Sequence, residues 1–266
     1  MTREVFAPGS FSIRNRVALW TLIKREMKRT WVVINQVVWP PIITTVLYVF
    51  VFGLALGSRI GDTQGVPYAA FLIPGLIMLQ VIDAAYGEAG SSVFQGRFLN
   101  HIQELLIAPM SALEIVLGFV IAGIARSFLI AGLITGLGLV LVHIGPQNWP
   151  LYALVVGSVA VLFTSIGIIF GLWAEKFDHI AIFTTFVITP LVFVGGVFTS
   201  IRFLPPLVQK LSLFNPMFYM IDAFRYSFTG RSDIGLEHSL TIVVGLAVFA
   251  FALALGMTAV GYKLRA

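Results

Sequence analysis

Long apolar runs, almost free of charge, constrain this chain more than any other feature. Five runs contain no Asp, Glu, Lys or Arg, and they cover residues 31–57, 63–82, 149–174, 180–201 and 239–262. A helix of about 20 mostly apolar residues crosses the hydrocarbon core of a bilayer. Because only helices and closed barrels satisfy their backbone groups in lipid, each run predicts a membrane-spanning helix.

A sixth run, at 115–142, is interrupted by Arg126. One central arginine opposes insertion by about 3 kcal/mol, whereas each Leu, Ile, Val or Phe favours it by about 0.3–0.6 kcal/mol. The run is rich in these four residue types, so insertion is favoured overall. We therefore expect six spans.

The composition supports an integral membrane protein with all-α architecture. Of the 266 residues 58% are hydrophobic and 11% charged, against about 25% charged in soluble domains. The chain has no cysteine, which excludes disulfides, thiolate metal sites and a cysteine nucleophile. We expect a cytoplasmic arm at 1–30, a transmembrane domain at 31–262 and a cytoplasmic tail at 263–266.

The distribution of Lys and Arg predicts the orientation in the membrane. With six spans, 11 of these cations fall on the side of the termini and five on the other side, and Arg126 lies within a span. Loops rich in Lys and Arg stay in the cytoplasm. Both termini are thus predicted to be cytoplasmic, and the first 30 residues lack the apolar core of a secretory signal.

The N-terminal arm has the pattern of an amphipathic helix. Apolar residues recur at helical spacing, with cations off that stripe; they are Ile13, Val17, Trp20, Ile23 and Met27. The pattern indicates a helix lying in the membrane interface. A solvated, positively charged flank is the alternative.

Motifs of soluble enzymes are missing. The sequence has no phosphate-binding loop, no H-E-x-x-H and no G-x-S-x-G. We therefore name no catalytic residue, and the chain should not hydrolyse ATP by itself. The four histidines are scattered at span ends and loops, so we name no metal site either.

The loop after the second span, taken as Ser91–Gly118, contains a stripe at helical spacing made of Phe94, Phe98, Ile102 and Leu105. A break follows at Pro109. We expect a short cytoplasmic amphipathic helix here. It would either lie at the lipid headgroups or dock into the groove of a partner, and the pattern leaves both open.

The loop after the fifth span, 202–238, is unusually apolar and breaks at Asn215 and Pro216. Each half is too short to span a bilayer. We expect two short re-entrant helices that dip into the outer leaflet, and a surface cap is the alternative. Asp222 and Arg225 lie three residues apart and are expected to pair on the polar face.

Three ionisable residues lie in or beside the second and third spans: Asp83, Glu88 and Arg126. Such groups face a bundle interior or water. An ion pair between Asp83 and Arg126 would brace the two spans. A polar lining for an amphiphilic cargo is the other interpretation.

Two segments resemble motifs of type-2 ABC transporter permeases, most closely the bacterial YadH-like branch. "FLPPLVQKLSLFNPMFYMIDAFR" is similar to the family signature, and "QELLIAPMSALEIVLG" resembles its coupling region. The likeness extends over essentially the whole chain. The resemblance places five residues on a coupling helix, with Arg97 beside that helix: Gln103, Glu104, Leu105, Ala108 and Pro109. It places seven residues on the re-entrant helices: Leu204, Pro205, Asn215, Pro216, Tyr219, Asp222 and Arg225.

The resemblance implies one permease subunit of an ATP-driven exporter in the bacterial inner membrane. The assembly would hold two permease copies, expected to be a homodimer, and two ATPase subunits that bind ATP and Mg²⁺. The chain itself would bind no cofactor and no nucleic acid, and its other partners would be membrane lipids. The cargo would be amphiphilic, lipid-linked or drug-like.

A secondary carrier or channel that works without an ATPase is the alternative function. Carriers tend to show inverted repeats and broken spans near the bilayer midplane. Neither pattern is visible in this sequence, and an intramembrane enzyme would need a cluster of polar catalytic residues that is also not visible.

Overall fold

The computed structural model describes residues 13, 15–55, 57, 61–63, 65–99 and 110–263, and it is almost entirely helical. Six helices are long and apolar enough to cross a membrane: Ile34–Gly53, Tyr68–Phe98, Ala112–Val142, Trp149–Trp173, Asp178–Val197 and Leu236–Val260. The number of spans predicted from the apolar runs is therefore confirmed, including the run that contains Arg126.

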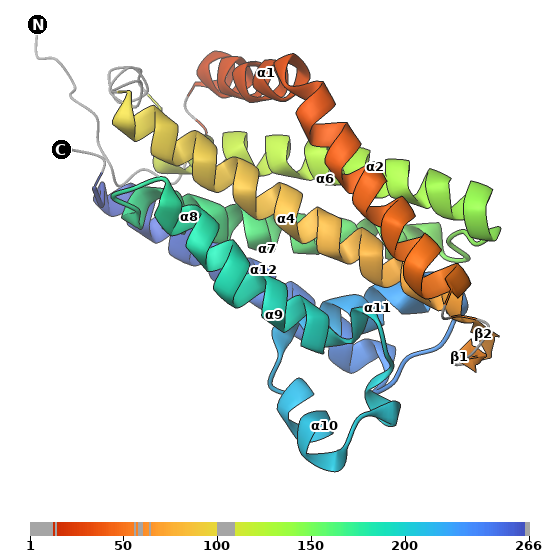
Figure 1. Ribbon diagram of the computed structural model, residues 1–266. Helices are drawn as coiled ribbons and strands as arrows, with labels where there is room; N and C mark the ends of the chain where they lie inside the picture. Colours follow the sequence, from red (N-terminus) through yellow and green to blue (C-terminus); the bar gives the residue numbers. More distant parts are fainter. Residues whose placement is uncertain are drawn as a thin grey trace, which may run out of the picture.

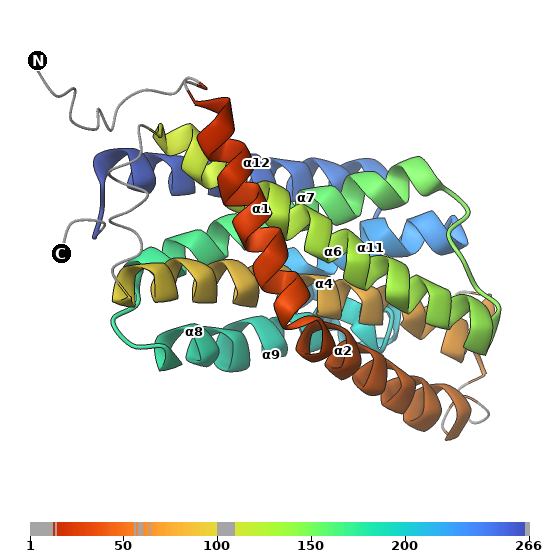
Figure 2. The same ribbon diagram turned by 90° about the horizontal axis from the view of Figure 1, so that it is seen from above.

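Helix α1 (Arg16–Val32) precedes the first span. That span is α2 (Ile34–Tyr48), continued by the π-helical segment η1 (Val49–Ala55). Helix α1 lies across α6 and α4, and the chain then turns at Val33 into α2 (Figure 2). A small hairpin follows, in which β1 (Asp62–Thr63) pairs antiparallel with β2 (Val66–Pro67).

The next three spans are α4 (Tyr68–Phe98), α6 (Ala112–Val142) and α7 (Trp149–Trp173). Helix α4 is the centre of the bundle, since 83% of the residues in its most apolar 18-residue stretch are buried (Figure 1). It packs closely against α7 because of two glycines. A Cβ added at Gly167 would lie 2.6 Å from the carbonyl oxygen of Tyr86, and one at Gly171 would lie 2.8 Å from that of Gly90.

The fifth span is built from short segments in series: α8 (Asp178–Phe183), η2 (Thr184–Ile188), α9 (Thr189–Val192) and η3 (Phe193–Val197). Gly196 interrupts its last turn with a φ of 94°, a conformation that favours glycine. The short 3₁₀ segment η4 (Ile201–Phe203) follows.

Two helices separate the fifth span from the sixth, α12 (Leu236–Val260). Helix α10 (Pro206–Ser212) projects from the bundle, whereas α11 (Pro216–Thr229) packs against α12, α4 and α7 (Figure 1). The predicted break is present, because Asn215 caps α11 by accepting the backbone N–H of Met217 at 3.0 Å. The amide of Asn215 also donates to the Leu191 carbonyl at 2.6 Å.

The extent predicted for the loop after the second span is wrong. Helix α4 continues to Phe98 and α6 begins at Ala112, so Phe94 and Phe98 belong to the last turns of the span. The charge-free run stopped at Asp83, but α4 continues because Glu88 and Arg97 both find partners within the bundle.

We call the two ends of the bundle the α1 end and the α10 end. The α1 end gathers α1, the last turns of α4, α7 and α12 and the first turn of α6; the α10 end holds α10, the hairpin and the start of α12 (Figure 1). Both Asn15 and Lys263 lie at the α1 end.

Candidate functional site

Three helices meet at a single carboxylate near the α1 end. Arg29 of α1 donates to Glu88 of α4 through Nε at 3.0 Å and Nη2 at 2.5 Å, and Nη2 also reaches the Glu88 carbonyl at 3.1 Å. The other carboxylate oxygen of Glu88 pairs with Arg126 of α6. These three side chains, which we call the junction triad, are 29%, 19% and 11% exposed in the order Arg29, Glu88, Arg126.

The expected ion pair between Asp83 and Arg126 is therefore wrong. A helical side chain leans toward the N-terminus of its own helix. For α6 that direction is the α1 end, so Arg126 reaches Glu88 rather than Asp83. Asp83 Oδ1 is buried and has no hydrogen-bond partner among the described residues.

Glu26 is a second acidic contact between α1 and α4. It is 4% exposed and accepts the hydroxyl of Ser92 at 2.7 Å. Arg25 donates to its other oxygen through Nε at 3.2 Å and Nη2 at 3.0 Å. Glu26 was not among the predicted site residues, although it is the only acidic residue in the basic segment 16–32.

The start of α1 is fastened to the start of α6. Glu114 is fully buried, accepts the N–H of Ser111 at 2.7 Å as part of a capping box, and also accepts the N–H of Asn15. Leu22 of α1 packs directly against Gly118 of α6. A Cβ added at Gly118 would lie 2.5 Å from Leu22 Cδ2. These contacts fix α1 against the bundle.

The predicted apolar stripe of the arm faces away from the bundle. Val17 is 76% exposed and Trp20 57% exposed, and Ile13 and Met27 are exposed as well. Ile23 is half-buried, whereas the face that packs on the bundle is formed by Leu22, Glu26 and Thr30. An exposed apolar stripe suits a helix in the membrane interface, and that location stays a prediction.

Arg97, expected beside the coupling helix, lies in the last turn of α4 and donates hydrogen bonds to the end of α7 and to the segment that follows α12. Nη1 donates to the carbonyls of Gly171 at 3.0 Å, Leu172 at 2.7 Å and Ala174 at 3.0 Å, which are left without helical partners where α7 ends. Nε donates to the Lys263 carbonyl at 3.0 Å. The other predicted coupling residues lie outside the described residues: Gln103, Glu104, Leu105, Ala108 and Pro109.

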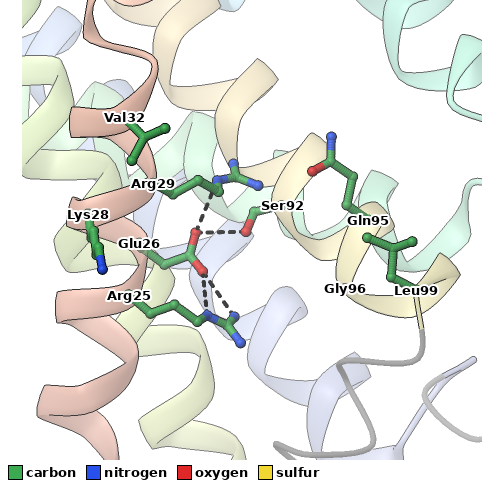
Figure 3. A pocket seen from close by; sticks show the side chains of 9 residues that line it. All are labelled: Arg25, Glu26, Lys28, Arg29, Val32, Ser92, Gln95, Gly96 and Leu99. Carbon is green, nitrogen blue, oxygen red and sulfur yellow. Dashed lines mark hydrogen bonds and ion pairs between the residues drawn. The ribbon is translucent and has the colours of Figure 1, made fainter.

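A groove of about 480 Å³ lies between α1 and the last turns of α4 (Figure 3). Figure 3 shows Arg25 and Arg29 extending from α1 toward α4, with Glu26 between them. Three cationic side chains and one acidic side chain are among the nine residues that line it: Arg25, Glu26, Lys28, Arg29, Val32, Ser92, Gln95, Gly96 and Leu99.

At the α10 end, Asp222 and Arg225 do not form the expected pair on an exposed face. Asp222 is 1% exposed and accepts three hydrogen bonds, from Ser232 Oγ at 2.6 Å, the Asp233 N–H at 2.7 Å and Ser239 Oγ at 2.8 Å. We call this cluster the serine knot. The pair is wrong because both side chains are buried and use other partners.

Arg225 is 2% exposed and donates to the Gly196 carbonyl at 2.6 Å. Its guanidinium carbon lies 3.8 Å from the centre of the Phe71 ring, which is a cation–π contact. Arg225 thus links α11 to the kink of the fifth span and to α4.

The remaining residues predicted for the two short helices have local roles. Pro205 precedes α10, and the amide of Gln209 donates to the Leu204 carbonyl at 2.8 Å. Pro216 opens α11, and the hydroxyl of Tyr219 donates to the Leu213 carbonyl at 2.6 Å. In the described part of the chain, no three His, Asp or Glu side chains gather as metal ligands would.

Comparison with known proteins agrees with this architecture. The family model of the ABC-2 type transporter matches residues 17–229. The chain is 40% identical over 248 residues to the "Inner membrane transport permease YadH" of Escherichia coli K12, which covers 93% of this chain and 96% of that relative. It is 32% identical over 191 residues to "Nodulation protein J" of Rhizobium leguminosarum bv. viciae, covering 70% of this chain and 72% of that relative.

The sequence resemblance is thus confirmed at the level of the family. A family model spanning most of the chain, a relative aligned over nearly its whole length and six membrane-capable helices lead to the same conclusion. The chain belongs to the ABC-2 type transporter family, as a membrane permease subunit.

Proposed function

We propose that this chain is the transmembrane subunit of an ATP-driven exporter that moves an amphiphilic, lipid-linked or drug-like substrate by alternating access. Two copies would assemble with two ATPase subunits, which supply the bound ATP and Mg²⁺. The family supports partnership with an ABC ATPase. The copy number, the direction of transport and the class of substrate are parts of the proposal.

The junction triad is the observation that carries this proposal. One carboxylate, Glu88, accepts from Arg29 and pairs with Arg126, so α1 cannot move without changing the contacts of α4 and α6. A conformational change is driven only by contacts that differ between two states. The pair of Arg29 with Glu88 would supply such contacts, since Arg29 is 29% exposed and an ion pair that water reaches contributes little to stability.

The distribution of cations among the described residues supports a cytoplasmic α1 end. Helix α1 alone carries Arg16, Lys24, Arg25, Lys28 and Arg29, and the same end adds Arg97, Lys176 and Lys263. Cytoplasmic segments retain Lys and Arg. The ATPase would then approach the α1 end of the bundle.

A conformational measurement tests the coupling without knowledge of the substrate. Because the chain has no cysteine, Lys24→Cys and Lys210→Cys give two unique sites for spin labels, one on α1 and one on α10. In the complex with its ATPase, trapping the nucleotide should change the distance between the labels. With Glu88→Gln we expect the ATPase to stay bound and to hydrolyse ATP, while the distance change is lost.

Glu237→Gln is the matched control, since this exposed acid in the first turn of α12 lies at the α10 end. An unchanged distance response in an assembled Glu88→Gln complex would count against the triad as the coupling element. Transport by the purified chain in vesicles without any ATPase would overturn the exporter proposal and favour a secondary carrier.

A further inference from the structure

The groove between α1 and α4 has the properties of a binding site for an anion. Arg25, Lys28 and Arg29 outnumber Glu26, which is the only acidic side chain in its lining. Glu26 already accepts from Ser92 and Arg25, and it also lies 3.7 Å from Nε of Arg29. The lining therefore has an excess of positive charge, and its volume of about 480 Å³ falls in the usual range of ligand pockets, about 300–1,000 Å³.

Both arginines keep donors available for a ligand. Arg25 uses Nε and Nη2 on Glu26, and Arg29 uses Nε and Nη2 on Glu88. Within the described chain, Nη1 of each guanidinium has no hydrogen-bond partner. Their own carboxylate contacts hold the guanidinium planes in place, and guanidinium is the group that matches phosphate oxygens best.

Exposed apolar side chains also line the groove. Val32 and Leu99 line it and are 76% and 57% exposed, and the adjacent Trp31 and Phe98 are 70% and 74% exposed. Val32 also lies where α1 turns into the first span, whose outer face continues with the exposed Trp39 and Ile43. A ligand with a charged head in the groove would thus have an apolar path along α2.

We infer that this groove binds the phosphate headgroup of an anionic membrane lipid, with Arg25, Lys28 and Arg29 around the phosphate and the acyl chains along α2. The cationic lining requires an anion, and the arginine geometry favours a phosphate. The exposed apolar wall favours a phosphate that is attached to hydrocarbon chains. Free phosphate shares the headgroup chemistry but lacks those chains.

Phosphatidylglycerol and inorganic phosphate are the probes that distinguish these sources. The full chain is purified without an ATPase, and the binding of each probe is measured by native mass spectrometry and by titration in phosphatidylcholine nanodiscs. The test variant is the double substitution Arg25→Gln with Lys28→Gln, which leaves the junction triad intact. The matched control is Arg16→Gln with Lys24→Gln, which removes the same charge from the same helix outside the groove.

We expect the groove variant to bind phosphatidylglycerol about tenfold more weakly, and the control less than about twofold, because each cation close to an anionic lipid surface contributes substantially to binding. Arg25→Lys with Lys28→Arg should restore most of the affinity, which separates lost charge from misfolding. Loss confined to phosphatidylglycerol identifies the lipid as the ligand; parallel loss for inorganic phosphate shows that the phosphate group alone suffices.

Equal weakening in the groove variant and the control would overturn the inference, because it would show diffuse attraction to α1 rather than a site. No weakening in either variant would overturn it as well. The measurement needs no ATPase, so its failure leaves the coupling proposal unaffected.

Discussion

The junction triad and the serine knot handle buried charge in opposite ways. Asp222 is 1% exposed, and every hydrogen bond it accepts comes from a hydroxyl or a backbone N–H in the segment 232–239. Glu88 is 19% exposed and is held by two cations from two other helices. The knot is local and centred on a buried carboxylate, whereas the triad joins distant segments and borders a groove.

This difference shows which cluster can change between states. Removing Asp222 leaves three donors without their acceptor, and a buried donor left unpaired costs about 1–3 kcal/mol. Partly exposed ions lose less, since water replaces their partners. We therefore expect the α10 end to determine stability and the α1 end to determine coupling.

Asp222→Ala should have the largest effect on stability. It removes the acceptor of Ser232, Ser239 and the Asp233 N–H, so we expect a loss of at least about 3 kcal/mol and poor accumulation in membranes. Thermal unfolding in detergent measures the loss. Ser239→Ala, which removes one donor together with its bond to Asp222, should cost only about 1 kcal/mol. If Asp222→Ala unfolded at the same temperature as the wild type, the proposed difference between the serine knot and the junction triad would be wrong.

The triad should give an intermediate effect. A double-mutant cycle of Arg29→Gln and Glu88→Gln should yield a coupling energy of about 1 kcal/mol, because Arg29 is 29% exposed. Glu88→Gln should destabilise more than Arg29→Gln, since it removes the counter-charge of Arg126 and leaves Arg29 only its longer contact with Glu26, at 3.7 Å. A coupling energy as large as the loss in Asp222→Ala would mean that the α1 end is as rigid as the knot.

The smallest effect is expected at the exposed contact between Glu175 and Lys263. The hydrogen bond from Lys263 Nζ, at 3.1 Å, lowers the pKa of the Glu175 carboxyl from its ordinary value of 4.5, and the charge of Lys263 acts in the same direction. A lowered pKa means that the contact stabilises the fold above pH 4.5 and that this contribution is lost as the pH falls through the lowered value.

Carboxyl NMR of the labelled protein should therefore show Glu175 titrating below its ordinary range. Lys263→Gln should return the pKa of Glu175 toward 4.5 while leaving thermal unfolding at neutral pH unchanged. An unchanged titration in Lys263→Gln would contradict the assignment of the shift to that lysine.

Most of the fold follows from hydrophobic length alone. The six spans were predicted from apolar runs, and even α6 with Arg126 obeys the insertion balance. The exception is the end of α4, where scanning for charge-free runs stopped at Asp83 although the helix continues to Phe98. The end of a charge-free run coincides with the end of a span only if the next charges are exposed. Glu88 and Arg97 are instead compensated by other segments, so the helix continues past them.

The candidate site was less predictable because it depends on which residues meet in space. The sequence suggested Asp83 as the partner of Arg126, and only the packing of α4 against α6 brings Glu88 to it instead. Asp222 and Arg225 have the spacing of an exposed pair, but the tertiary structure buries both. Glu26 left a usable sign in the sequence, as the single acid in a basic helix, whereas Glu114 left none for its contact with a residue 99 positions earlier.

That contact sets an order of biogenesis. The backbone N–H of Asn15 finds its acceptor on a carboxylate that the ribosome adds 99 residues later, at the entrance to the third span. Until α6 has been inserted, the start of α1 lacks this acceptor, although Glu26 and Arg29 can already contact α4. Complete docking of α1 is therefore expected only after the third span is in place.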